Sequence, residues 1–111
     1  MSLLHFIEQG EPTAPPLVIL HGLFGTLDNW QTLARRWAED AGLRVISVDL
    51  RNHGRSFHSP EHSYALMAAD VLTLLDHLAL DPARLTVMGQ AHGHFAAHAV
   101  AHYREAGGVE G

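Results

Sequence analysis

The chain has 111 residues, of which 47% are hydrophobic and 17% are charged, and its formal net charge is −5. This composition predicts one folded, soluble domain over residues 1–111, and no apolar run is long enough to cross a bilayer. The acidic balance without a basic stripe excludes nucleic acid and membrane partners, and the absence of cysteine excludes disulfides and thiolate metal sites. Because the first residues lack a secretory signal, we expect a cytoplasmic protein.

Four segments are predicted to form strands. Residues 3–8 are expected to form a short edge strand, and a turn-rich break follows from Gln9 to Pro16. The continuous apolar runs at 17–20, 44–50 and 85–88 are typical of buried strands in a parallel sheet.

Three helices are predicted between and after these strands. The first has Thr26 or Asp28 as its cap and ends at Gly42. The second covers about 63–80 and stops at a proline, and the third covers about 92–105. Since strands and helices alternate, the sequence predicts an α/β fold of three layers, in which a mostly parallel sheet has helices on both faces.

The segment 89–93, with the sequence Gly-Gln-Ala-His-Gly, has the frame of a nucleophile elbow but carries Ala91 where the attacking serine belongs. It follows a short apolar strand and opens a helix of small residues, which is the context that a G-x-S-x-G motif requires. Because a methyl group is no nucleophile, the segment is predicted to keep the shape of the elbow without its chemistry.

Two further segments follow predicted strands. Glycines in residues 21–25 allow a sharp turn whose amide N–H groups suit an oxyanion hole, although a plain tight turn has the same composition. Residues 49–56 are interpreted as a polar loop braced by Asp49 and Arg51. The irregular stretch 51–62 is either a functional rim or a surface connection.

In this order and at this spacing, the three segments resemble the α/β-hydrolase family, in particular its small esterases. The resemblance covers nearly the whole chain and implies the N-terminal half of an α/β-hydrolase fold. It also implies that the amides of Leu23 and His92 are the remnant of an oxyanion hole. The family's elbow commonly has the sequence Gly-His-Ser-x-Gly-Gly, so the chain departs from it at Gln90, Ala91 and His94. The family's catalytic acid and histidine come from strands beyond this sequence, so no serine-hydrolase activity is expected.

The chain contains ten histidines, more than its length leads us to expect. His94, His98 and His102 recur every four residues, so a helix places them along one face, and His92 precedes them at the elbow. Imidazoles at this spacing bind Zn²⁺, Co²⁺, Ni²⁺ or Cu²⁺ when further ligands complete the site. The alternative is a set of satisfied polar residues, with His102 stabilising the helix end.

The coincidence of a lost nucleophile and added imidazoles favours an engineered, catalytically inactive scaffold with a divalent-metal site on the third helix. Two alternatives stay open: a residual esterase fragment that binds small esters or acids, and a structural module that self-associates. Because the sequence stops after the third helix, strand 85–90 is expected to present unpaired backbone groups. A homodimer through this edge is therefore expected.

Overall fold

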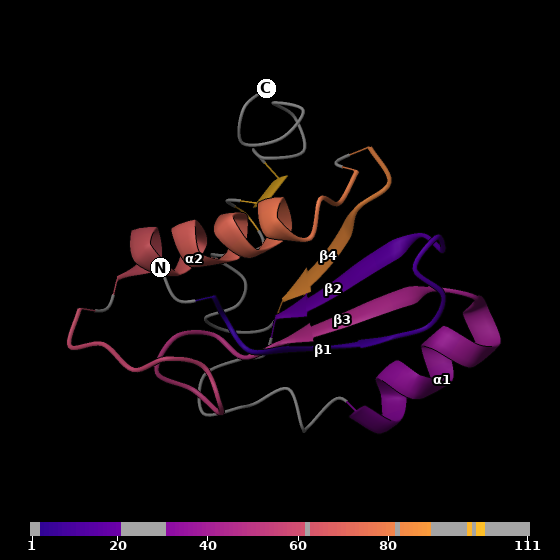
Figure 1. The fold of residues 1–111 in the computed structure, drawn as a ribbon, viewed down its shortest axis with the longest axis horizontal. Coiled ribbons are helices and arrows are strands. Elements are labelled where there is room, and N and C mark those ends of the chain that lie inside the picture. Colours follow the sequence, from indigo (N-terminus) through magenta and orange to yellow (C-terminus); the bar gives the residue numbers. More distant parts are fainter. Residues whose placement is uncertain are drawn as a thin grey trace.

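The computed structural model describes residues 3–20, 31–61, 63–81, 83–89, 98 and 100–101. The part of the chain that it describes contains a four-stranded sheet with a helix on each face (Figure 1). In chain order the elements are β1 (Phe6–Gln9), β2 (Pro16–Leu20), α1 (Gln31–Ala41), β3 (Arg44–Val48), α2 (Tyr64–His77) and β4 (Thr86–Gly89).

The strands lie in the order β1-β3-β2-β4. Strand β2 runs parallel to both of its neighbours, and β1 pairs antiparallel with the outer side of β3, as an edge strand. Helix α1 connects β2 to β3 on one face, and α2 connects β3 to β4 on the other (Figure 1). This arrangement confirms the predicted three-layer α/β fold.

The α2 face of the sheet holds the larger core. Alternate residues of β2 and β3 point toward α2, because successive side chains of a strand face opposite sides. They pack against the apolar stripe of the helix, and Val100 joins them from the far end of the described chain. The buried members of this cluster are Leu4, Val18, Leu20, Ile46, Val48, Leu50, Met67, Val71, Leu74, Leu75, Leu80, Leu85 and Val100.

The α1 face holds a smaller cluster. Its buried members are Leu17, Ile19, Ala34 and Val45, and partly buried side chains such as Trp37 surround them. Ala34 is the buried residue of α1, so the helix approaches the sheet through a small side chain. Both faces of β2 are therefore covered, which explains the continuous apolar run that predicted a buried parallel strand.

Helix α2 ends earlier than the sequence predicts. Its start agrees with the prediction, with Ser63 as the cap, but the helix ends at His77 rather than Leu80. The backbone turns left-handed at Ala79, with a φ of 53°, and the N–H of Leu80 donates to the Leu75 carbonyl over 3.4 Å. This backbone cap stops the helix before the sequence reaches its proline. Neither helix of the described residues is long and apolar enough to cross a membrane.

Candidate functional site

The candidate site lies at the edge of the sheet where the three parallel strands end. Leu20, the last residue of β2, pairs with Val48 of β3 and with Gly89 of β4. Neighbouring strands are about 4.8 Å apart, so the segments that follow β2, β3 and β4 leave the sheet from adjacent positions. In open α/β sheets, ligands bind outside the carboxyl ends of the strands. This edge is therefore where a ligand site is expected.

The predicted oxyanion segment begins directly after Leu20, and the predicted elbow begins with Gly89. The register thus brings together the residues from which the two segments start. The five predicted site residues that follow lie outside the described part of the chain: Leu23, Ala91, His92, His94 and His102.

His98 is the member of the predicted metal site that the structure describes. Residues 98, 100 and 101 have helical conformation, which agrees with a third helix in this region. The side chain of His98 is exposed, and Val100 is buried in the core cluster of the α2 face. Over the described residues, no group of three or more histidine, aspartate or glutamate side chains is arranged to hold a metal ion.

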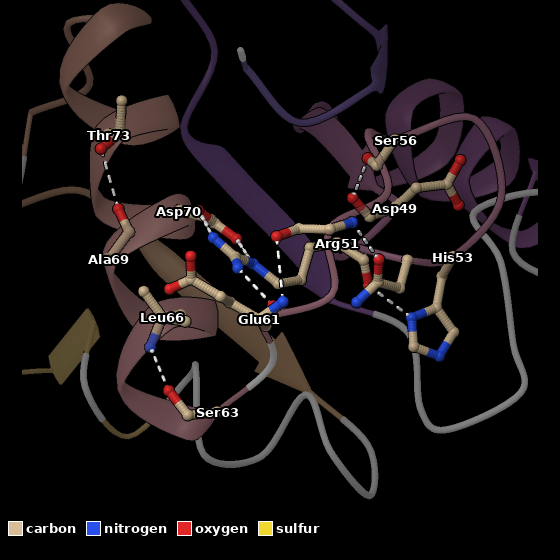
Figure 2. A network of polar contacts seen from close by, with 12 residues as sticks. Asp49, Arg51, His53, Ser56, Glu61, Ser63, Leu66, Ala69, Asp70 and Thr73 are labelled. Atoms are coloured by element: carbon tan, nitrogen blue, oxygen red, sulfur yellow. Dashed lines mark hydrogen bonds and ion pairs between the residues drawn. The ribbon is translucent and has the colours of Figure 1, made fainter. Parts of the chain in front are cut away.

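A nearly buried ion pair fixes the loop that follows β3. Arg51 Nε donates to Asp70 Oδ2 over 2.6 Å, and Nη2 donates to Oδ1 over 2.9 Å (Figure 2). The third nitrogen, Nη1, donates to the Glu61 carbonyl over 2.8 Å, and the guanidinium lies 5.2 Å from the centre of the Phe57 ring. A two-pronged arginine–carboxylate contact fixes direction as well as distance. Arg51 therefore ties residues 51–61 to α2.

The hydrogen bond from Asp70 raises the pKa of Arg51 above its ordinary value, although burial of the guanidinium acts in the opposite direction. When folding raises the pKa of a basic group, the charged group stabilises the folded state. This stabilisation is fully present at pH values below the pKa of the unfolded chain and is lost as the pH rises through the pKa of the folded chain. For arginine this window lies far above neutral pH. Arg51 therefore remains charged in the loop at any pH at which the protein would be handled.

Asp49 organises the first half of the same loop. Its carboxylate accepts a hydrogen bond from the N–H of Arg55 over 3.0 Å, and its carbonyl accepts one from the Ser56 hydroxyl. Gly54 has a φ of 51° and lies so close to the Asp49 carboxylate that a Cβ there would collide with it. Ser56 also accepts a hydrogen bond from the N–H of His5 over 2.8 Å, which joins the loop to the segment before β1.

His53 lies on this loop with its ring in a defined orientation. Its Nδ1 is 2.8 Å from the carbonyl oxygen of Arg51, and the residue is half-buried (Figure 2). Because a carbonyl oxygen only accepts hydrogen bonds, Nδ1 is the donor. In the neutral ring the proton is then on Nδ1, and Nε2 carries the acceptor lone pair.

The sequence interpretation of residues 49–56 as a polar loop braced by Asp49 and Arg51 agrees with these contacts. Sequence reasoning missed Asp70, the partner of Arg51, and gave His53 no role. A carboxylate within the apolar stretch of α2 was the available signal for Asp70. Its partner is 19 residues away, so no local pattern identified the pair.

Comparison with known proteins places the chain in a family. A family model described as "alpha/beta hydrolase fold" matches residues 15–104. The mouse protein named sn-1-specific diacylglycerol lipase ABHD11 is 44% identical over 82 residues, which cover 74% of this chain and 27% of the mouse protein. Esterase YbfF of Escherichia coli is 41% identical over 85 residues, covering 77% of this chain and 32% of the esterase. The chain belongs to the α/β-hydrolase fold family and spans about a third or less of these relatives.

Solved structures agree with this assignment. An esterase from a marine microorganism is 35% identical, with a TM-score of 0.75, over 84% of this chain and 34% of its own. The epoxide hydrolase VrEH1 of Vigna radiata has a TM-score of 0.81 over 94% of this chain and 33% of its own. Its identity of 20% makes it evidence for the fold alone. These likenesses confirm the fold that the sequence predicted.

Proposed function

We propose that this chain forms the ligand-binding edge of an α/β-hydrolase-fold protein that binds small esters or carboxylic acids without cleaving them. The observation that carries the proposal is the pairing of Leu20 with Gly89, from which the predicted oxyanion segment and the predicted elbow both start. Amide N–H groups at such an edge bind the carbonyl oxygen of an ester or acid. The relatives named as esterases and lipases support an acyl ligand.

Ala91 is the reason to propose binding without turnover. In a serine hydrolase the serine hydroxyl attacks the acyl carbon, and loss of that nucleophile alone costs roughly a million-fold in kcat. An alanine methyl group cannot form the acyl-enzyme. Oxyanion donors and apolar contacts do not depend on the hydroxyl, so ligand affinity is expected to survive its loss.

Titration of the full chain with methyl butyrate tests this function. We expect amide NMR shifts at Leu20 and Gly89, and no butyrate release above the rate in buffer. Ala91→Leu fills the proposed site and is expected to abolish the shifts. Ala69→Leu adds the same side chain at an exposed position of α2 and serves as the matched control. Hydrolysis by the native chain, or shifts that persist in folded Ala91→Leu, would contradict the proposal.

A divalent-metal site on the third helix is the second candidate function. The helical conformation at residues 98, 100 and 101, with His98 exposed and Val100 in the core, supports a histidine face directed away from the sheet. Spacing by four along a helix assigns His94 and His102 to the same face. His92 is proposed as a further ligand, and Zn²⁺, Co²⁺, Ni²⁺ and Cu²⁺ all suit imidazole. A bound metal here would support the interpretation that the chain is an engineered scaffold.

Calorimetric titration of the full chain with ZnCl₂ tests the metal site. We expect saturable binding that His98→Ala weakens at least ten-fold, because each imidazole nitrogen is a direct ligand. His77→Ala, which removes an exposed histidine at the end of α2, is the control and should change nothing. Equal affinity in the two variants would exclude His98 as a ligand.

Self-association through the β4 edge is also proposed. β4 is the last strand in the order of the described sheet, and its residues are exposed or half-buried. Two such edges can pair antiparallel about a two-fold axis. Light scattering is expected to give a dimer that Thr86→Lys, which places a charge on the edge, converts to monomer. Ala69→Lys adds the same charge on α2, and an equal loss of dimer there would argue against the β4 edge.

A further inference from the structure

One side of helix α1 carries an exposed apolar stripe. Leu33 is 37% exposed, which makes it the exposed large hydrophobic residue of the described chain. Trp37 lies one turn further along and is half-buried, because it packs only in part against the smaller apolar cluster. Since residues four positions apart are neighbours on a helix surface, the two side chains form a continuous stripe. Tryptophan is among the residues that most often anchor protein contacts.

The stripe lies on the side of α1 that faces away from β1. Gln31 accepts a hydrogen bond from Gln9 Nε2 over 2.9 Å, and a Cβ on Gly10 would meet the Ala38 methyl group. These contacts turn the Gln31 and Ala38 side of the helix toward β1. With about 3.6 residues per turn, the stripe falls on the other side. Figure 1 shows α1 across the sheet from α2, so α2 does not cover the stripe.

The charges of α1 are arranged against the dipole of the helix. Arg35 and Arg36 lie in its second turn, whereas Glu39 and Asp40 lie in its last turn, which has no basic residue. A helix favours acidic side chains at its start and basic side chains at its end. All four side chains are exposed, and none forms an ion pair within the described part of the chain. This arrangement is unfavourable in a single helix and favourable beside a helix of opposite direction.

Two copies of α1 satisfy both features when they pack antiparallel about a two-fold axis through Trp37. The apolar stripe then packs against itself, with Leu33 of one copy opposite Ala41 of the other. Arg36 and Asp40 lie along the outer border of the stripe, so Arg36 of each copy comes within reach of Asp40 of the other. Each acidic last turn also lies beside the first turn of the other helix. The surface is therefore complementary to itself, as a closed two-fold contact requires.

We propose that the stripe of Leu33 and Trp37, bordered by Arg36 and Asp40, is a contact surface for a second copy of this chain. The contact is separate from the proposed ligand edge and from the proposed pairing of β4. One helix stripe buries much less than the roughly 1,600 Å² of a standard stable complex. The contact is therefore weak, and it joins chains, or pairs of chains already associated through β4, only at high protein concentration.

Sedimentation equilibrium over a series of concentrations tests this contact in the full chain. Thr86→Lys is the background, so that the β4 edge does not contribute, and it should pass from monomer to dimer as the concentration rises. Arg36→Asp and Asp40→Arg each place like charges opposite one another across the axis. Either change should weaken the association about ten-fold. An equal mixture of the two variants sets opposite charges face to face again, so it should restore the association.

Matched variants separate the proposed contact from a general effect of charge. Arg35→Asp and Glu39→Arg make the same charge changes on the β1 side of α1 and should leave the association unchanged. Leu33→Ser removes the exposed side chain of the stripe and should weaken the association, while circular dichroism confirms the fold. A background variant that stays monomeric at every concentration would overturn the inference. So would a mixture that associates no better than its two components, or an equal loss in Arg35→Asp.

Discussion

The two faces of the sheet are built in different ways. The α2 face combines a large apolar cluster with a nearly buried ion pair, which lies beside the carboxyl end of β3. The α1 face has a small cluster, a buried alanine at the helix contact and a buried serine whose hydroxyl makes no hydrogen bond within the described part of the chain. The main stabilising core therefore lies under α2, the same helix that supplies Asp70 to the loop beside the candidate site. On this face, both the stability of the protein and the geometry of the loop beside the site therefore depend on α2.

Removal of Asp70 tests that dependence and should have the largest effect. Asp70→Ala leaves the guanidinium of Arg51 without its carboxylate, in a pair whose side chains are 9% and 13% exposed. Breaking a buried pair by removing one partner costs about 3–5 kcal/mol of unfolding free energy. Urea denaturation measures the loss. Glu8→Ala is the control, because its 2.8 Å pair with Arg44 is more exposed and should cost below about 1 kcal/mol. Equal losses would contradict the difference in burial.

The same deletion on each face measures the two cores directly. Leu74→Ala on the α2 face removes a fully buried side chain and should cost about 3 kcal/mol. Leu17→Ala on the α1 face removes one that is 9% exposed and lies in the smaller cluster. We expect its cost to be about 2 kcal/mol, because water and neighbouring side chains fill part of the space. A larger loss at Leu17, in urea denaturation under identical conditions, would reverse the assignment of the main core.

Substitution of two glycines beside α1 distinguishes the cost of a steric clash from the cost of backbone strain. Both have positive φ, 96° at Gly10 and 64° at Gly42. A Cβ at Gly10 would collide with the Leu43 carbonyl, whereas at Gly42 it would meet open space. Gly42→Ala is expected to cost about 1 kcal/mol from strain alone, and Gly10→Ala about 2 kcal/mol more. Thermal denaturation of both variants gives the difference, and equal costs would show that Leu43 moves aside.

The smallest effect is expected from the buried hydroxyl of Ser47. Its Oγ is buried in β3 and has no hydrogen-bond partner among the described residues. Ser47→Ala removes the unmet polar group and should raise the unfolding free energy by about 1 kcal/mol. Ser63→Ala is a control with the opposite expected sign. Ser63 caps α2, so its loss should lower the unfolding free energy by about 1 kcal/mol. A destabilised Ser47→Ala variant would show that the α1 face uses this hydroxyl.

Much of the fold was predictable because its signals are local. Continuous apolar runs marked the strands at 17–20, 44–50 and 85–88, and each lies within two residues of the observed β2, β3 and β4. The predicted end of α2 was wrong because Ala79 adopts a left-handed conformation. This conformation is unusual for alanine, so the sequence does not indicate it. The predicted roles of residues 21–25 and 90–94 stay predictions, since these residues lie outside the described chain.

The sequence by itself determined the alternation of strands and helices, the two-sided burial of β2 and the family, because periodicity and short motifs are written in neighbouring residues. Only the tertiary structure decided that Leu20 lies between Val48 and Gly89, that Asp70 holds Arg51, and that the Nδ1 of His53 lies against the Arg51 carbonyl. These are contacts between segments far apart in the chain, and their geometry arises when packing selects one register and one helix position.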